Sequence, residues 1–297
     1  MKLISIGEIL WDVIGGREHL GGALLNLSVH ASRLGHEVFL MSAVGADQRG
    51  DRALETMLSL GLSIGCVQRS DEWPTGIVTV TVAGDGQPEF EIHRPAAYDS
   101  MKIDRGALDR LASRDPEWIC YGTLLSLYPR GRNLLLETMD AIPRARRFYD
   151  VNLRPKAFTS ELVLELLGRA TVVKLNQDEV RSLDSMIQRS NRTLEELCRD
   201  YAARFGWEAI CVTRGELGCA ILVGDQYVEV SGYRVQVADT VGAGDAFSAA
   251  FLHGLNAGWP PAQIGDFANR LGALVASRPG GAPPWSLDQI EALSRSA

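Results

Sequence analysis

The segment 238–251, which reads ADTVGAGDAFSAAF, combines residue types that phosphate chemistry requires. Gly242 and Gly244 lack a Cβ atom, so a phosphate could approach the backbone N–H groups around Ala243 closely. An amphipathic helix is expected to begin at Asp245, and the N-terminus of a helix favours negative charge. The Asp245 carboxylate could accept a proton from an attacking hydroxyl there. Taken alone, these residues also fit a tight turn with Asp245 as the helix N-cap.

Two other groups of residues could take part in the same chemistry. Asn176 and Glu179 are three residues apart and share one face of a helical turn, although an ordinary helix start with a capping box explains them as well. Thr213 and Gly215 lie just past a buried-type strand, at the carboxyl end where open α/β sheets bind ligands. A plain turn at the exit of the strand is the alternative for this pair.

Charged residues elsewhere are further candidates for ligand contacts. Asp12 follows the first strand and is either a ligand contact or a solvated acid of a loop. Arg154, in the sequence DVNLRP, could reach a phosphate or substrate oxygen as a fork donor, and a structural salt bridge explains it equally well. The five histidines are scattered along the chain and form no set of metal ligands.

Short apolar runs alternate with amphipathic stretches along the chain. Strands are expected at residues 2–7, 38–41, 118–121, 148–151, 172–175 and 210–212. Helices are expected at residues 23–34, 51–60, 132–139, 161–167, 194–205 and 261–277. A strand-like approach at 235–237 leads into the glycine turn. This alternation predicts an α/β fold in which a mostly parallel sheet carries helices on both faces.

Residues 11–21 and 74–95 interrupt this alternation. The first segment is β-like with a turn at 15–16, and the second predicts a β-hairpin with a turn at 84–86. Because both segments leave the α/β body early in the chain, we expect them to pair into one small sheet outside it. The chain contains no internal repeat or linker, so we expect residues 1–297 to form a single domain from which these two segments protrude.

The composition is that of an ordinary globular protein. With 297 residues and 46% hydrophobic residues, the chain can bury about 75% of its unfolded surface and needs no disulfide. The net charge of −7 argues against a nucleic-acid partner. Five cysteines form no C-x-x-C pair, which favours a reducing compartment. We expect a cytoplasmic protein with no membrane partner, because neither a signal peptide nor a long apolar run is evident.

The string Asp239–Asp245, DTVGAGD, resembles the second signature of the PfkB, or ribokinase-like, carbohydrate kinases. Four further family motifs follow the family order: the first signature at Gly21-Gly22-Ala23-x-x-Asn26 with Val44–Gly50, the N-x-x-E motif at Asn176–Glu179, the nucleotide-binding turn at Val212–Gly218, and the loop Gly280-Gly281-Ala282. The resemblance covers essentially the whole chain. It implies a ribokinase-like three-layer α/β/α body with a small β-sheet lid.

The resemblance implies roles for the candidate residues. Asp245 would be the general base that takes the proton from a primary hydroxyl of the sugar, and the backbone of Gly242, Ala243 and Gly244 would form the anion hole for the transferring phosphoryl group. ATP and Mg²⁺ would be the cofactors, and Asn176 and Glu179 would organise the magnesium-bound phosphates, Glu179 through water. The remaining ATP contacts implied by the family are Thr213, Gly215, Gly218, Asn269 and Gly281.

The sugar is expected near the amino terminus. Asp12 matches the family carboxylate that accepts hydrogen bonds from sugar hydroxyls, and the floor of its pocket would be lined by Gly21, Gly22 and Asn26, with Arg154 within reach. Residues 11–21 and 74–95 resemble the family lid, which closes over the sugar and excludes water. We expect a homodimer through this lid.

Several short motifs resemble the fructokinase branch more than other branches of the family: Leu20–Ala23, Ser42–Gly45, Pro74–Gly76 and Gly122–Leu124. The expected reaction is the ATP-dependent phosphorylation of fructose to fructose 6-phosphate. Alternative substrates are 2-keto-3-deoxygluconate, ribose or a nucleoside, and a non-catalytic sugar- or nucleotide-binding protein is the alternative from another class. Relatives also suggest a monovalent cation such as K⁺ beside Asp239 and Val241, although Pro284 replaces one polar position found in ribokinase.

Overall fold

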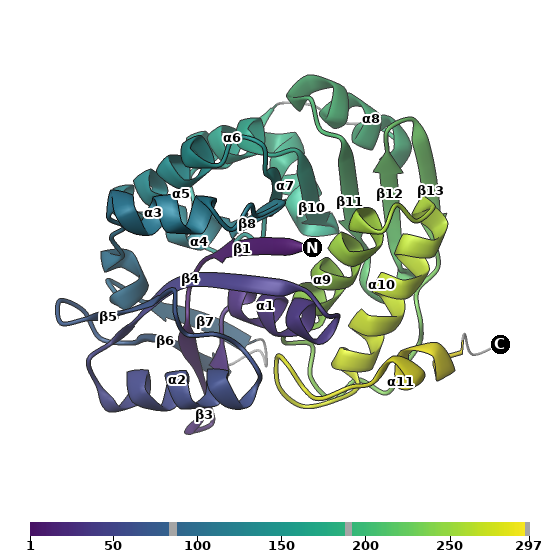
Figure 1. The fold of residues 1–297 in the computed structure, drawn as a ribbon. Coiled ribbons are helices and arrows are strands. Elements are labelled where there is room, and N and C mark those ends of the chain that lie inside the picture. Colours follow the sequence, from purple (N-terminus) through teal and green to yellow (C-terminus); the bar gives the residue numbers. More distant parts are fainter. Residues whose placement is uncertain (83–87, 188–191, 295–297) are drawn as a thin grey trace.

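The computed structural model describes residues 1–82, 88–187 and 192–294, and is built around a nine-stranded sheet (Figure 1). The strand order is β13-β12-β11-β10-β9-β8-β1-β4-β5. All neighbours from β5 to β11 are parallel, and β12 and β13 form an antiparallel edge. The bounds are β1 (Lys2–Ile6), β4 (Glu37–Gly45), β5 (Val67–Ser70), β8 (Trp118–Gly122), β9 (Arg146–Asp150), β10 (Val172–Asn176), β11 (Ala209–Thr213), β12 (Cys219–Val223) and β13 (Gln226–Val230).

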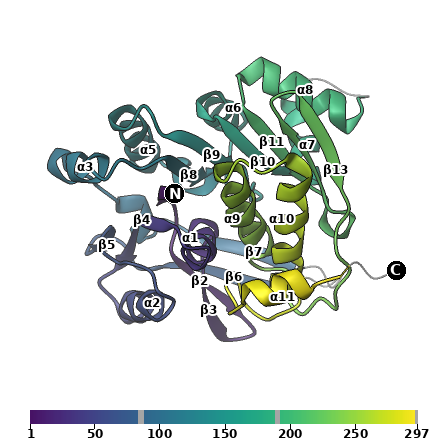
Figure 2. The ribbon, with the colours of Figure 1, turned by 45° about the vertical axis from the view of Figure 1, so that its right-hand side comes forward.

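Helices cover both faces of this sheet (Figures 1 and 2). One layer consists of α1 (Ala23–Arg33), α2 (Gln48–Ser59), α9 (Ala243–Asn256), α10 (Pro261–Ala276) and α11 (Leu287–Ala292). The opposite layer consists of η1 (Ala97–Ser100), α3 (Arg105–Ala112), α4 (Thr123–Ser126), α5 (Pro129–Ala141), α6 (Ser160–Arg169), α7 (Gln177–Met186) and α8 (Leu194–Phe205). The predicted three-layer α/β/α arrangement is confirmed.

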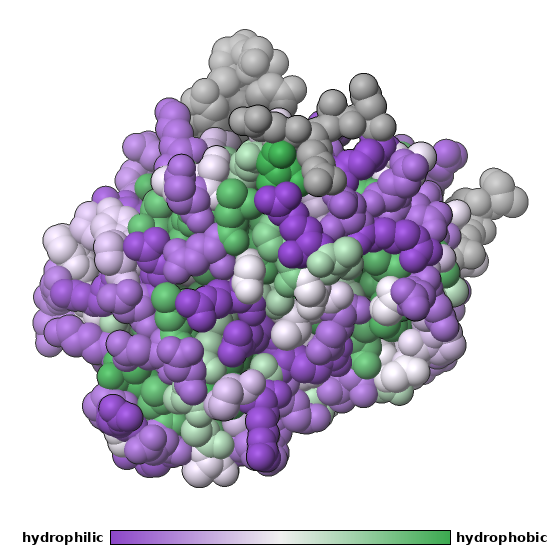
Figure 3. Space-filling view, turned by 90° about the horizontal axis from the view of Figure 1, so that it is seen from above, coloured by the Kyte–Doolittle hydropathy of each residue, from purple (hydrophilic) through white to green (hydrophobic). Residues whose placement is uncertain are grey.

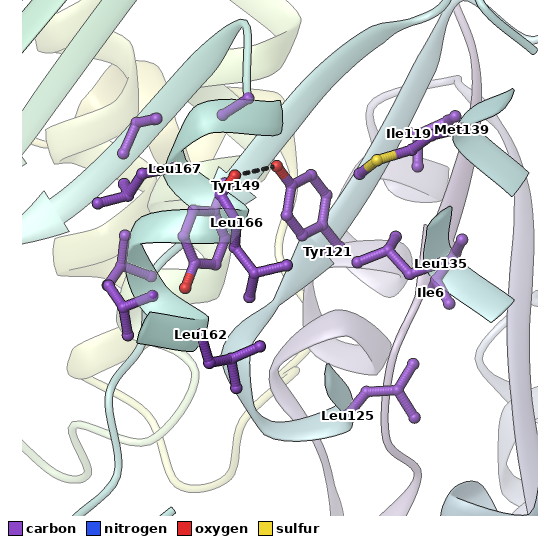
Figure 4. Packing of buried hydrophobic residues seen from close by; sticks show 14 of the residues in the cluster. Ile6, Ile119, Tyr121, Leu125, Leu135, Met139, Tyr149, Leu162, Leu166 and Leu167 are labelled. Atoms are coloured by element: carbon purple, nitrogen blue, oxygen red, sulfur yellow. Dashed lines mark hydrogen bonds between the residues drawn. The ribbon is translucent and has the colours of Figure 1, made fainter. Parts of the chain in front are cut away.

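Side chains alternate between the two layers, because successive residues of a strand point to opposite faces. In β1, Leu3 packs into the layer of α1 and α9, whereas Ile4 and Ile6 pack into the layer of α5 and α6. Figure 4 shows part of this second layer, where Tyr121 of β8 and Tyr149 of β9 stack with their ring centroids 5.0 Å apart. The Tyr121 hydroxyl donates to the Leu166 carbonyl at 3.0 Å, so the buried ring satisfies its polar end.

A second sheet of four strands lies outside the large one, in the order β3-β2-β6-β7 (Figure 2). Its strands are β2 (Leu10–Ile14), β3 (Arg17–Gly21), β6 (Gly76–Val82) and β7 (Pro88–His93). The two interrupting segments therefore pair as predicted, with β2 and β6 side by side and parallel. The predicted turn at 84–86 lies outside the described residues.

The segment leading to the glycine turn differs from the prediction. Residues 235–237 form no strand, and Val237 is 59% exposed. Instead, Ala238 N and Asp239 N donate to the Ala276 carbonyl, so the end of α10 anchors this segment rather than the sheet. The prediction of a strand was wrong. Val235 and Val237 favour a strand by residue type, but residues 235–237 pair with no strand of either sheet. Helix α9 begins at Ala243, two residues before the predicted start.

The face of the molecule seen in Figure 3 is largely hydrophilic. On the face shown in Figure 3, polar residues surround small separate apolar areas. Within the described ranges, no helix combines the length and the apolar character that crossing a membrane requires.

Candidate active site

Four neighbouring parallel strands end at the same edge of the large sheet, and their last residues are polar or small. The register pairs Gly122 of β8 with Asp150 of β9, and Asp150 in turn with Lys174 of β10. Asn176, at the end of β10, pairs with Thr213 of β11. Ligands bind outside the carboxyl ends of strands in open α/β sheets, so this row is the natural floor of a site.

The first turn of α9 faces this edge and presents free amide groups. Gly242 is the N-cap and has a φ of 77°, and a Cβ atom there would lie 2.0 Å from the Gly281 carbonyl oxygen. Ala243 N donates to Thr240 O at 3.3 Å. The amides of Gly244 and Asp245 have no hydrogen-bond acceptor among the described residues. Such amides at a helix N-terminus attract an anion.

The Asp245 carboxylate lies in this turn and is bound from α1. Asn26 Nδ2 donates to Asp245 Oδ2 at 2.8 Å. Burial, and next the Asp150 charge, raise the pKa of Asp245 to about 7, while the Asn26 hydrogen bond and the cations of Lys174 and Arg154 act in the opposite direction. A carboxylate with a pKa near neutral pH is suited to accept a proton and later release it.

Asn176 and Glu179 form the capping box that their spacing allows. Asn176 Oδ1 accepts hydrogen bonds from Asp178 N and Glu179 N, both at 2.9 Å, and Glu179 Oε2 accepts from Asn176 N at 2.7 Å. The other carboxylate oxygen, Oε1, accepts from Leu153 N at 3.0 Å. Burial raises the pKa of Glu179, and the Lys174 charge opposes this. A structural role is therefore present, and a role at phosphate remains a prediction.

A cavity of about 370 Å³ lies between the small sheet, α1 and the strand ends. Asp12 of β2, Gly22, Asn26 and Arg154 line it together with Asp245. Predicted substrate residues that are far apart in the sequence thus share one cavity.

Asp12 belongs to β2 and is the carboxylate that the small sheet contributes to this cavity. Burial raises its pKa to about 6, with Arg154 opposing and Glu8 adding to the shift. Gly21 is paired with the neighbouring residue Leu10 and does not line the cavity. A Cβ atom at Gly21 would nevertheless lie 2.3 Å from Asp12 Oδ2, so Gly21 leaves the space that the Asp12 side chain needs.

A second cavity, of about 490 Å³, lies between β11, α9 and α10. It is lined by four predicted nucleotide residues, namely Thr213, Gly215, Gly218 and Asn269, and by Ala243 of the predicted anion hole. Asn269 is buried, and its Nδ2 donates to the carbonyls of Val230 and Ser231 at 3.2 Å. The two cavities share Thr213, Thr240 and Gly244, so they meet at the residue before Asp245.

The family model for pfkB family carbohydrate kinases matches residues 7–287. This chain belongs to the pfkB family of carbohydrate kinases. Among the curated relatives of this pfkB kinase is the fructokinase of Escherichia coli, which is 30% identical over 275 residues that cover 88% of this chain and 86% of the relative. Its likeness agrees with the resemblance to the fructokinase branch, and the chain is a sugar kinase by family.

Solved structures show the same architecture. A fructokinase of Xylella fastidiosa with bound ATP has a TM-score of 0.86 and 21% identity, covering 98% of this chain and 97% of that one. An uncharacterized sugar kinase of Pyrococcus horikoshii in complex with ATP has a TM-score of 0.80 and 26% identity, covering 94% and 93%. The predicted ribokinase-like fold is confirmed for this pfkB kinase.

Residues 280–282 of this pfkB kinase lie against α1, and the ATP contact implied for Gly281 remains a prediction. Gly281 lines neither cavity, and a Cβ atom there would lie 2.7 Å from Asn26 Nδ2. The neighbouring Gly280 N donates to Asp239 Oδ2 at 3.1 Å, while Asp239 Oδ1 accepts from Val241 N at 3.0 Å. The Asp239 carboxylate thus connects the loop before α9 with the loop after α10.

Sequence reasoning missed several charged and polar residues of the site. Lys174, Asp150 and Ser248 form a buried network beneath the first turn of α9, and Glu8 lines the first cavity with a carboxylate that accepts from Ala23 N at 2.9 Å. Burial raises the pKa of Glu8. A lysine inside the apolar run of β10 was the available signal, because charged residues are rarely buried without a partner.

Proposed function

We propose that this pfkB kinase is an ATP-dependent fructokinase, which transfers the γ-phosphoryl group of ATP to a primary hydroxyl of fructose and forms fructose 6-phosphate. The observation that carries the proposal is that the two cavities meet at Thr240 and at Gly244, the residue directly before Asp245. Sugar in the first cavity and nucleotide in the second would bring hydroxyl and phosphoryl group together beside that carboxylate. The E. coli fructokinase at 30% identity supports fructose as the sugar.

Asp245 and the first turn of α9 would perform the chemistry. The Asp245 carboxylate takes the proton of the sugar hydroxyl, whose oxygen forms a bond to the γ-phosphorus while the bond to the bridging oxygen breaks and ADP leaves. The backbone of Gly242, Ala243 and Gly244 would form the anion hole, and the free amide of Asp245 would add to it in stabilising the charge on the transferring group. The guanidinium of Arg154, which lines the same cavity, would donate hydrogen bonds to a substrate oxygen.

Magnesium-bound phosphates would lie near Asn176 and Glu179. The donor chemistry fits, since Mg²⁺ prefers carboxylate oxygen and retains several waters. Both Glu179 carboxylate oxygens accept backbone hydrogen bonds, which favours contact through water. When bound, the ion neutralises charge on the phosphates. Thr213, Gly215, Gly218 and Asn269 would hold the nucleotide, as lining residues of the second cavity.

The small sheet would act as the lid of one kinase domain. Asp12 and Ile14 of β2, Val78 of β6 and Ile92 of β7 line the first cavity, so the sheet supplies both a carboxylate and apolar cover. Apolar cover excludes water that would compete for the phosphoryl group. We also propose pairing of two copies through this sheet, and sedimentation of the protein as a monomer at micromolar concentration would contradict it.

A monovalent cation such as K⁺ would bind beside the anion hole, near Asp239 and Val241. In support, the Asp239 carboxylate already joins the loop at Val241 to the loop at Gly280. A cation at this junction would hold the first turn of α9 in place. Equal turnover rates in potassium chloride and in tetramethylammonium chloride would rule the ion out.

A substrate panel tests the function directly. Coupled ADP release would be measured with fructose, ribose, 2-keto-3-deoxygluconate and adenosine at matched ATP, and we expect the highest kcat/KM for fructose. If kcat/KM were highest for another of these substrates, that compound would replace fructose as the proposed substrate, and the kinase assignment would stand. If Asp245→Asn retained sugar-dependent ATP consumption, the assignment of the base would be wrong. If the unmodified protein released no ADP with any of these substrates, a sugar- or nucleotide-binding protein without turnover would replace the kinase.

A further inference from the structure

A charge pair lies buried beneath the first turn of α9, and no predicted role accounts for it. Lys174 and Asp150 are register partners on adjacent strands β10 and β9, so their side chains leave the sheet on the same face. Lys174 Nζ lies 3.0 Å from Asp150 Oδ1 and 3.3 Å from Oδ2. The two side chains are only 7% and 3% exposed.

The pair is connected to α9 by Ser248. The Ser248 hydroxyl donates to Asp150 Oδ2 at 2.7 Å and also lies 2.9 Å from the Gly244 carbonyl oxygen, one helical turn earlier. A Cβ atom at Gly244 would lie 3.4 Å from Lys174 Nζ, so the ammonium is in contact with the turn that carries Asp245. Lys174 also lines the first cavity.

The charges around Asp245 come from three sides. Asp150 from β9 disfavours an ionised Asp245, while Lys174 from β10 and Arg154 from the segment after β9 favour it, and Asn26 from α1 donates to it. Lys174 also faces Glu179 of α7, and although burial acts against its charge, these carboxylates keep the pKa of Lys174 above its usual value. Lys174 is therefore charged throughout the neutral range, opposite Asp150.

We propose that Lys174 and Asp150 are positioning residues for the phosphoryl transfer: the two buried charges offset one another at Asp245, so that its carboxylate can ionise and accept the proton, and Ser248 fixes the turn of α9 above them. The inference rests on the proposed function, since it assigns Asp245 as the base. It adds two residues whose removal should act on the ionisation of Asp245 rather than on the binding of the sugar.

Opposite charges predict opposite shifts. Lys174→Met removes the favourable charge and should raise the pKa of Asp245 by about one unit or more, whereas Asp150→Asn should lower it by a similar amount. The double variant Lys174→Met/Asp150→Asn should return the pKa close to that of the unmodified protein. A purely structural role would not produce shifts of opposite sign.

The test is a ¹³C NMR titration of the aspartate side-chain carboxyls in the ligand-free protein, with the Asp245 signal assigned by its loss in Asp245→Asn. Lys102→Met, at an exposed lysine, is the control and should leave the Asp245 signal unchanged. The pH profile of kcat should move in parallel, with little change in sugar KM. If Lys174→Met does not fold, Asp150→Asn and the double variant still carry the test.

The inference would be overturned if the pKa of Asp245 were unchanged in Asp150→Asn, if the pKa in the double variant stayed at the Asp150→Asn value, or if the two single variants shifted it in the same direction. Its failure is distinguishable from failure of the proposed function, because the titration needs no substrate. A protein that phosphorylates no sugar but shows the opposite shifts would retain the charge coupling and lose the kinase role. Normal fructokinase activity without these shifts would support the proposed function and overturn the charge coupling.

Discussion

Asn26 Nδ2 donates a hydrogen bond of 2.8 Å to Asp245 Oδ2, across 219 positions of sequence. The bond joins the first turns of α1 and α9, and residues of both turns line the first cavity. Through it, the amino-terminal part of the chain touches the carboxylate that we assign as the base. The cavity for the sugar and the proton acceptor are thus fixed to one another directly.

Replacing Asn26 should leave a smaller fraction of Asp245 ionised at neutral pH. Asn26→Ala removes a hydrogen bond to the ionised form, so the pKa of Asp245 should rise by about one unit and activity at pH 7 should fall. The pH dependence of kcat/KM, measured from pH 5.5 to 9, checks this shift. Asn256→Ala, at an amide on the opposite end of α9 that binds Trp118, is the control and should leave the pH profile in place.

The pKa of Asp245 near 7 sets the acidic limit of activity. The base must be ionised to accept a proton, so kcat/KM should rise about tenfold per pH unit below pH 7 and level off above it. A profile that is flat between pH 5.5 and 8 would contradict a base with this pKa. The assay would use saturating magnesium at every pH, so that nucleotide binding does not limit the rate.

Asp245→Asn should stabilise the fold while it abolishes turnover. Burial raises the pKa of Asp245 in the folded state from its ordinary value of 3.8 to about 7, so the ionised group destabilises the fold fully above pH 7 and not at all below about pH 4. The variant should therefore gain on the order of a few kcal/mol at pH 8. Urea unfolding at pH 8 and pH 5 checks this, since the gain must shrink as the pH falls.

Gly242→Ala should damage the protein far more than Gly258→Ala. Both glycines have a positive φ, 77° and 68°, so both substitutions cost about 1–2 kcal/mol of backbone strain. At Gly242 the new Cβ atom would also lie 2.0 Å from the Gly281 carbonyl oxygen, whereas at Gly258 nothing lies within 4 Å. Crowding should add about 1–3 kcal/mol and displace the first turn of α9. Equal unfolding free energies in the two variants would contradict this packing.

Gly21→Ala should weaken sugar binding. Its Cβ atom would lie 2.3 Å from Asp12 Oδ2, so the carboxylate must move away from the position in which it lines the cavity. We expect a KM for fructose that rises about tenfold or more, which corresponds to the loss of one charged hydrogen bond, with a smaller change in kcat. Gly16→Ala, in the same hairpin with nothing within 4 Å, is the matched control and should keep the KM unchanged.

The sequence predicts those parts of the fold that depend on local pattern. Alternating strands and helices, the two segments of the small sheet and the glycine turn before Asp245 all have local signals, and the structure contains them. The signals fail where tertiary partners decide the conformation. Residues 235–237 have the residue types of a strand, but the segment is held by hydrogen bonds from Ala238 and Asp239 to the end of α10. The strands β12 and β13 were not predicted.

The same distinction holds at the candidate site. Asp245, Asn176 and Thr213 belong to contiguous motifs, so their spacing could single them out. Lys174 and Asp150 become partners only when β9 and β10 align, and nothing within either strand reports that register. Asn26 could be selected by its motif, but its hydrogen bond to Asp245 depends on how α1 and α9 pack.

The two cavities draw on different parts of the chain. Every residue that lines the second cavity falls between Thr213 and Ala276, whereas more than half of those that line the first lie between Glu8 and Leu124 and the rest between Asn152 and Asp245. Substitutions in the amino-terminal part can therefore reshape the sugar cavity without altering the nucleotide cavity. Such a separation lets substrate preference diverge during evolution while the phosphoryl donor stays the same.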